Sequence, residues 1–142
     1  MTVLGFDYGR RRIGVAVGQA VTGDARPLET LTCPAEGAPD WDAIGAVIDA
    51  WQPDAVVVGR PEQADGTASA VTLGAERFAR QIHGRFGLPV HMVDERLSSR
   101  EAGWRRQDAP QRARRRDPGL DSMAACVILE TWLADAVTQT ND

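Results

Sequence analysis

Short apolar runs bounded by turn residues alternate with stretches in which apolar residues recur every three or four positions. The runs are rich in β-branched residues and predict five strands, at residues 3–9, 13–18, 25–32, 55–59 and 89–93. The three-to-four spacing predicts four helices, at residues 41–51, 68–86, 98–107 and 118–137. The predicted apolar face of the second helix consists of Val71, Ala75, Phe78, Ala79 and Ile82, and the predicted packing stripe of the last consists of Leu120, Met123, Ala124, Val127, Ile128, Thr131 and Leu133. Asp40 is a residue of the type that caps a helix, and Gly87 stands where a glycine commonly ends one. The predicted order is three strands, then helix, strand, helix, strand, and finally two helices.

This order predicts an α/β fold built on one sheet. Consecutive strands joined by short glycine-bearing turns form antiparallel hairpins, whereas strands joined through a helix are parallel with right-handed crossovers. The continuous apolar run at 55–59 is typical of a parallel strand that is buried on both faces. We expect a ribonuclease H-like fold, with a mixed five-stranded sheet in the order 3-2-1-4-5 flanked by helices. The length predicts a single domain over residues 1–142.

Three acidic residues occupy places that such a fold can bring together. Asp7 ends the first predicted strand, Glu95 follows the last one, and Asp121 lies near the start of the final helix. Each of them alone has a simpler explanation. Asp7 can pair with one of the arginines that follow it, Glu95 can pair with Arg96, and an acid in the first turn of a helix is stabilised by the helix dipole.

The joint placement of these acids is more informative than any one of them. Strand ends in an open α/β sheet meet at one edge, and a helix laid over the sheet can carry Asp121 to that edge. Carboxylates brought together repel each other unless cations neutralise them, and hard oxygen ligands select Mg²⁺ or Mn²⁺. One or two such ions can activate water for phosphodiester hydrolysis. We therefore predict that Asp7, Glu95 and Asp121 are catalytic and metal-binding residues.

Charge is distributed unevenly along the chain. The net charge is −4, yet residues 96–116 hold eight arginines and two acidic residues, so this segment carries +6 and the remainder −10. An acidic body with one basic segment suits a polyanionic partner, although a solvated basic face is the alternative. Trp104 in this segment either stacks on an unpaired base or packs on the core. The predicted nucleic-acid contacts are Arg10, Arg11, Arg12, Arg96, Arg105, Arg106, Arg112, Arg114, Arg115 and Arg116.

Composition argues against membrane and secreted proteins. No apolar run approaches the roughly 20 residues that a membrane span needs, and the N-terminus lacks a basic stretch followed by a long apolar one. The two cysteines, Cys33 and Cys126, match no metal-ligand spacing, so we expect reduced thiols in a cytoplasmic protein. The remaining aromatic and histidine residues are expected to be structural, namely Trp41, Trp51, Trp132, His83 and His91.

Four motifs follow one another over nearly the whole chain: GFDYG with RIGVA within 5–16, VVGRP with DGT within 57–67, DERLS at 94–98, and DSMAA with IL within 121–129. In this order they resemble the YqgF (RuvX) family, bacterial relatives of the RuvC Holliday-junction resolvase. The resemblance implies a nuclease that matures the 5′ end of pre-16S ribosomal RNA, and it places Asp7, Glu95 and Asp121 on the acidic motifs of the family. Ala124 and Ala125 stand where RuvC-type relatives carry a fourth acid.

Several functions remain open on the sequence alone. Structured RNA and branched DNA are both possible substrates, because metal-assisted cleavage does not require the 2′-hydroxyl. A junction resolvase would cut two opposed strands, so it would be a homodimer. A non-catalytic RNA-binding assembly factor is a further alternative. The glycine-bearing turns also resemble phosphate loops of sugar kinases, but that fold needs two lobes and 142 residues supply one.

Overall fold

The computed structural model describes residues 1–60, 70–94 and 119–140, but not the side chains of residues 60, 70, 71, 94, 119–121 and 135–140. The expected helix at 98–107 lies outside these residues, as do Glu95 and Trp104. The described elements follow the predicted order. They are β1 (Thr2–Asp7), β2 (Arg12–Gln19), β3 (Asp24–Thr32), α1 (Trp41–Trp51), β4 (Ala55–Arg60), α2 (Ala70–Phe86), β5 (Val90–Asp94) and α5 (Gly119–Thr140).

The five strands form one mixed sheet in the order β3-β2-β1-β4-β5, which confirms the predicted order. β1, β2 and β3 form an antiparallel meander, and β4 and β5 join it as parallel strands. In the register of the parallel part, Phe6 lies beside Val58, and Val58 lies beside Met92. The last residues of β1 and β5 therefore lie at the same end of the sheet, where its parallel strands have their C-terminal ends. We call this end the sheet edge.

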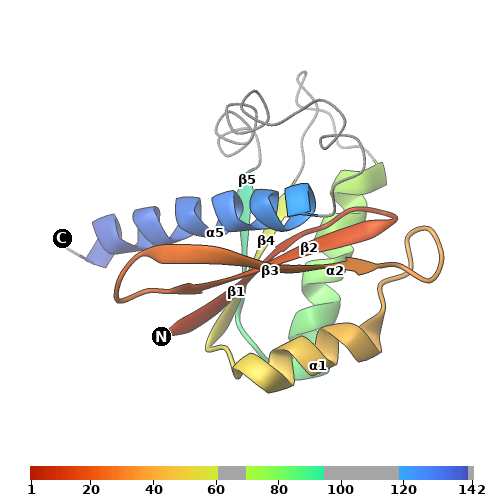
Figure 1. Ribbon diagram of the computed structural model, residues 1–142, viewed down its shortest axis with the longest axis horizontal. Helices are drawn as coiled ribbons and strands as arrows, with labels where there is room; N and C mark the ends of the chain where they lie inside the picture. The colour runs from red at the N-terminus through yellow and green to blue at the C-terminus, as the bar shows by residue number, and fades with distance from the viewer. Residues whose placement is uncertain (61–69, 95–118, 141–142) are drawn as a thin grey trace.

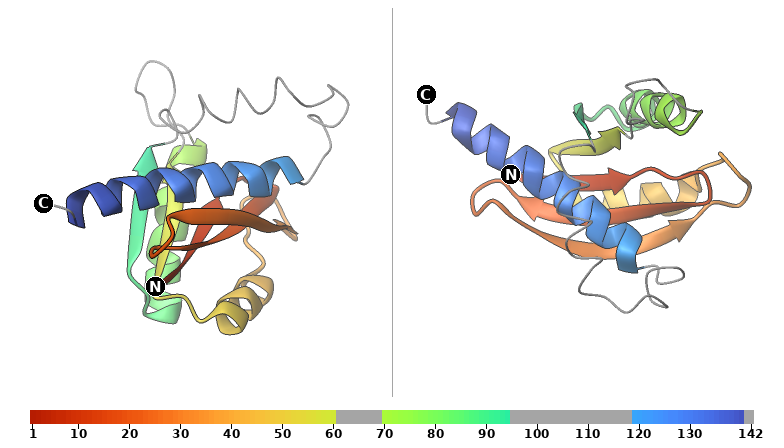
Figure 2. Two further views of the ribbon diagram at one scale, coloured as in Figure 1. Left: turned by 60° about the vertical axis from the view of Figure 1, so that its left-hand side comes forward. Right: turned by 90° about the horizontal axis from the view of Figure 1, so that it is seen from above.

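The helices cover the two faces of the sheet unequally (Figures 1 and 2). α1 and α2 cover one face, while α5 is the one described helix that lies across the other. Side chains of a strand alternate between faces. Leu4, Phe6 and Tyr8 of β1 accordingly belong to the core under α1 and α2, whereas Val3 belongs to the core under α5. We call these the α1/α2 face and the α5 face.

The structure confirms local features of α1 and α2 that the sequence predicts. The Asp40 side chain accepts a hydrogen bond of 3.2 Å from the backbone N–H of Ala43, so Asp40 caps α1 as expected. α1 ends at Gln52, whose φ of 46° is left-handed. On α2, four predicted apolar-face residues are buried: Ala75, Phe78, Ala79 and Ile82.

The predicted packing stripe of α5 is wrong in part. It included Met123, Ala124 and Thr131, which are only half-buried. Val127, Ile128 and Leu133 are buried as predicted, and Ser122, Ala125, Cys126 and Leu129 are buried as well. The reason is that α5 crosses the middle of a broad sheet and touches β1, β2 and β3, so a wider side of the helix is covered than a narrow stripe predicts. α5 also continues to Thr140, beyond the predicted end at 137.

The residues expected to be structural have structural contacts. Trp41 and Trp51 pack against the α1/α2 core, Trp132 packs against the α5 core, and the ring of His91 stacks on Trp132 at 4.9 Å. His83 Nδ1 lies 2.9 Å from the carbonyl of Leu88. Both cysteines are free thiols, as predicted. Among the described helices, none is both long enough and apolar enough to cross a membrane.

Candidate active site

Asp7 is the last residue of β1 and is half-buried at the sheet edge. Its Cα lies opposite Gly14 of β2. Val3 lies in the α5 core and Leu4, Phe6 and Tyr8 lie in the other core, so the alternation of the strand assigns Asp7 to the α5 face. A carboxylate at the end of an otherwise apolar strand needs hydrogen bonds or a cation to be stable there.

Close packing between α5 and β1 sets the direction in which the helix runs. A Cβ on Gly18, which lies beside Val3, would come within 2.9 Å of Leu133. A Cβ on Gly5 would lie 3.0 Å from Leu129 Cβ and 3.1 Å from the carbonyl oxygen of Ala125. Moving along β1 from residue 3 to residue 5 thus corresponds to moving backward along α5, from residue 133 towards residue 125.

Asp7 and Asp121 both lie further along this same direction. Asp7 is two residues beyond Gly5 on the strand, and Asp121 is about one helical turn before Ala125 on α5. The backbone of α5 therefore begins at the edge of the sheet where β1 ends, on the face to which Asp7 is assigned. The side chain of Asp121 lies outside the description.

Glu95, the third predicted acid, directly follows β5 and lies outside the described residues. The described part of β5 supplies one relevant observation: Val93 packs in the α5 core. Among the residues that the structure describes, no group of three or more His, Cys, Asp or Glu side chains is placed to hold a metal ion. Since the side chains of Glu95 and Asp121 fall outside that set, the predicted trio stays a prediction.

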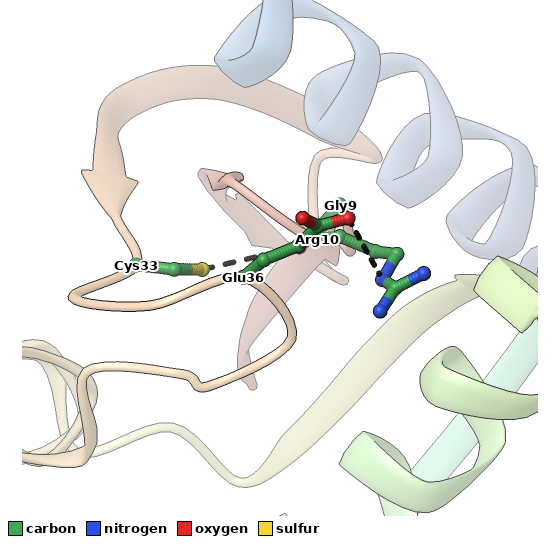
Figure 3. Close-up of polar contacts among 4 residues, drawn as sticks. All are labelled: Gly9, Arg10, Cys33 and Glu36. Atoms are coloured by element: carbon green, nitrogen blue, oxygen red, sulfur yellow. Dashed lines mark hydrogen bonds and ion pairs between the residues drawn. The ribbon is translucent and has the colours of Figure 1, made fainter.

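The turn between β1 and β2 follows Asp7 directly and is held by several contacts (Figure 3). A Cβ on Gly9 would lie 2.5 Å from the carbonyl oxygen of Arg12, so only glycine allows this turn to close. The Cys33 thiol lies 3.9 Å from the carbonyl oxygen of Gly9. Arg10 pairs with Glu36 at 3.6 Å, so its side chain is in contact with the segment that leads into α1.

The predicted nucleic-acid contacts fall into two groups. Arg10, Arg11 and Arg12 are exposed on the turn beside Asp7, which is where a phosphate near that carboxylate would be contacted. The other seven lie outside the described residues: Arg96, Arg105, Arg106, Arg112, Arg114, Arg115 and Arg116.

Tyr8, which was not predicted as a site residue, is 7% exposed, and its ring packs on Phe78 with a centroid distance of 5.3 Å. Burial raises the pKa of the Tyr8 hydroxyl, the Cys33 thiol raises it further, and the nearby charges of Arg10 and Arg77 oppose the rise. Burial also raises the pKa of the Cys33 thiol, with a further contribution from Asp40. The alternation of side chains along β1 could have identified Tyr8, because it places Tyr8 on the face opposite Asp7, under α2.

Known proteins similar to this chain agree with this architecture. The family model described as "RuvX: Holliday junction resolvase" matches residues 1–135. A protein of Azotobacter vinelandii named "Putative pre-16S rRNA nuclease" is 53% identical over 134 residues, which cover 94% of this chain and 93% of that protein. A protein of the same name from Pseudomonas putida is 51% identical and covers 92% of this chain and 93% of that protein.

Solved structures show the same fold at low sequence identity. RuvC of Thermus thermophilus in complex with a Holliday junction substrate superposes with a TM-score of 0.60 and 18% identity, covering 97% of this chain and 96% of that one. The Fowlpox virus resolvase in complex with Holliday junction DNA gives a TM-score of 0.56 and 11% identity, covering 96% and 99%. These likenesses confirm the ribonuclease H-like fold that the sequence predicted. Since the family model covers almost the whole chain and relatives are about half identical to it, the chain belongs to the RuvX family.

Proposed function

We propose that this chain is a metal-dependent endonuclease that processes the 5′ end of pre-16S ribosomal RNA. The names of its relatives support the substrate, since proteins half identical to this chain are named as pre-16S rRNA nucleases. The observation that carries the chemistry is the position of Asp7. A half-buried carboxylate ends the central strand, on the face and at the edge where α5 begins.

The other two acids complete the proposed site. Asp121 lies in the first turn of α5, and Glu95 follows Val93 of the α5 core by two positions in the chain. Three carboxylates at one edge form an all-oxygen donor set, which suits Mg²⁺ or Mn²⁺ rather than softer metals. When bound, one or two such ions supply an activated water and stabilise the leaving oxygen of a phosphodiester. The role of the protein is to hold the carboxylates in place and to orient the phosphate.

The exposed arginines of the turn supply the second part of the proposed role. Arg11 and Arg12 follow Asp7 within five residues and are exposed. Their guanidinium groups can donate paired hydrogen bonds to a phosphate oxygen, which would fix the backbone of the substrate beside the carboxylates. Phosphate contacts position a substrate without reading its sequence, so recognition of the cleavage site must come from other contacts or from RNA shape.

The Asp7→Asn variant tests the proposal directly. We expect cleavage of a pre-16S RNA fragment with Mg²⁺ to fall at least about 100-fold, because even changes to groups that support a metal ligand cost about 10–100-fold. Chelation of the metal should abolish cleavage by the unchanged chain, and added Mg²⁺ or Mn²⁺ should restore it. Glu29→Gln is the matched control, since it removes an exposed carboxylate from β3 of the same sheet.

A four-way DNA junction assayed in parallel separates the two substrates. The family description names a Holliday junction resolvase, so branched DNA is the second candidate substrate. Loss of RNA cleavage in Asp7→Asn with no junction cleavage by either chain would support RNA processing. Asp7-dependent cleavage of the junction alone would replace the proposed substrate. Binding without cleavage under every metal condition would refute the nuclease and favour an assembly factor.

A further inference from the structure

The α1/α2 face carries a pocket of about 560 Å³ that the proposed metal chemistry does not use. Three segments far apart in the sequence form it: the turn after β1, the segment leading into α1, and one side of α2. The volume lies in the range of about 300–1,000 Å³ that is typical of small-molecule sites. The residues used below are Tyr8, Arg10, Trp41, Leu73, Arg77 and Gln81.

Two arginines give the pocket a positive character. Arg10 and Arg77 both line the pocket, and the charges of both lower the pKa of the Tyr8 hydroxyl in its wall. Arg77 has no acidic partner among the residues that the structure describes. Among the described residues, the acidic partner of Arg10 is Glu36 at 3.6 Å, and the two side chains are 45% and 55% exposed. An exposed pair of this kind is weak, so an incoming anion can compete for Arg10.

Aromatic side chains form another part of the wall, where the Arg85 guanidinium also lies over the Trp41 ring at 4.3 Å. Tyr8 and Trp41 both pack on the ring of Phe78, at 5.3 Å and 5.6 Å between centroids, and Phe78 itself is 1% exposed. Leu73 of α2 is 58% exposed, which is unusual for a large apolar side chain and leaves it available to a ligand. Gln81 adds an amide that can donate and accept hydrogen bonds. The pocket therefore suits an anionic group attached to a flat, largely apolar one.

The location of the pocket narrows the ligand further. Tyr8 follows Asp7 directly in the chain and points to the opposite face of the sheet. The pocket and the proposed carboxylate site are thus back to back at one sheet edge. A strand of nucleic acid that crosses this edge can present its scissile phosphate to Asp7 and a neighbouring nucleotide to the pocket.

We propose that this pocket binds one unpaired nucleotide, with its phosphate between Arg10 and Arg77 and its base against the apolar wall. That the nucleotide belongs to the substrate strand rests on the proposed nuclease function. A free mononucleotide has the same chemistry and is the other possible source. When a nucleotide of the substrate strand is bound in the pocket, the distance between the pocket and Asp7 fixes how far from that unpaired nucleotide the strand is cut.

Fluorescence anisotropy with a labelled single-stranded oligouridylate tests this inference, with Mg²⁺ present and again in chelator. Arg77→Gln should weaken binding about tenfold, the usual scale for losing one charge-assisted contact. Arg80→Gln is the matched control on the same helix, because Arg80 is exposed but does not line the pocket. It should change the Kd by less than about twofold. Both arginines are exposed, so both variants should fold.

Unlabelled AMP as a competitor separates the two sources of the ligand. Competition that depends on Arg77 at sub-millimolar AMP assigns the pocket to free nucleotides, and Arg77-dependent oligonucleotide binding that AMP does not displace assigns it to the strand. Equal effects of Arg77→Gln and Arg80→Gln on the Kd, or no effect of either, would overturn the inference. Anisotropy reports binding without cleavage. A chain that binds through Arg77 but never cleaves would therefore refute the nuclease proposal alone.

Discussion

At the scale of single residues, Asp7 and Tyr8 are neighbours in the chain but have different surroundings. The alternation of β1 sends Asp7 to the α5 face and Tyr8 to the α1/α2 face. Tyr8 then shares its surroundings with Cys33, and burial raises the pKa of both groups. The folded chain therefore keeps both side chains neutral, as their apolar surroundings require.

The raised pKa of Cys33 predicts how stability depends on pH. The folded chain holds the thiol proton more tightly than the unfolded chain, so the protonated thiol contributes to the free energy of unfolding. This contribution is complete below pH 9.0, the ordinary thiol pKa, and is lost as the pH rises past that value. Thermal unfolding followed by circular dichroism should show a falling midpoint between 9.0 and 10.0, where Tyr8 begins to contribute. Cys33→Ser, which cannot ionise, should show a smaller fall. Identical pH profiles for the two chains would contradict this reading.

At the scale of elements, the sequence predicted the strands better than the helix contacts. Strand positions and order followed from apolar runs and from the length of each connection, which are local properties. The full extent of the buried side of α5 did not follow from local sequence. Ala125 and Leu129 are covered because they lie close to Gly5, on a strand 120 residues earlier in the chain. The pocket escaped prediction for the same reason. In the sequence, Arg77 is an ordinary exposed residue of an amphipathic helix, and only the fold brings Tyr8 and Arg10 into the same pocket with it.

Gly5→Ala tests whether α5 depends on this close approach. The added Cβ would lie 3.0 Å from Leu129 Cβ and 3.1 Å from the carbonyl oxygen of Ala125, neither of which can rotate away. The helix must shift, so the free energy of unfolding should fall by about 1–3 kcal/mol. Gly84→Ala in α2 is the control, because nothing lies within 4 Å of its added Cβ. It should stabilise the chain by about 1 kcal/mol through helix propensity.

Urea denaturation of the two alanine variants measures both effects under one condition. If Gly5→Ala proves as stable as the unchanged chain, α5 can move without cost and does not fix the position of Asp121 relative to Asp7. In that case the close packing of α5 on β1 would no longer support a joint site of these two acids. The opposite signs expected for the two substitutions separate this packing effect from a general response to added methyl groups.

At the scale of the whole molecule, charge is distributed unevenly between two parts of the chain. The described body is acidic apart from its arginine-bearing turn and helix, whereas residues 96–116 carry a net charge of +6. That segment lies between β5, after which Glu95 follows, and α5, in which Asp121 lies. The described elements that flank this segment in the chain, β5 and α5, both reach the end of the sheet at which the active site is proposed. A polyanionic substrate held by this segment would be concentrated where cleavage is proposed.

Salt dependence of binding separates a specific role of this segment from the effect of total charge. Each phosphate contact adds about 0.7–0.9 to the slope of log K against log salt, because bound counterions are released. Replacing Arg114 and Arg115 by Gln should therefore reduce the slope for the RNA substrate by about 1.4–1.8 if both contact phosphates. Replacing Arg26 and Arg80 of the described body changes the net charge equally and should leave the slope nearly unchanged. Equal slopes for the two double variants would assign binding to net charge rather than to residues 96–116, and the segment would then have no local role at the sheet edge.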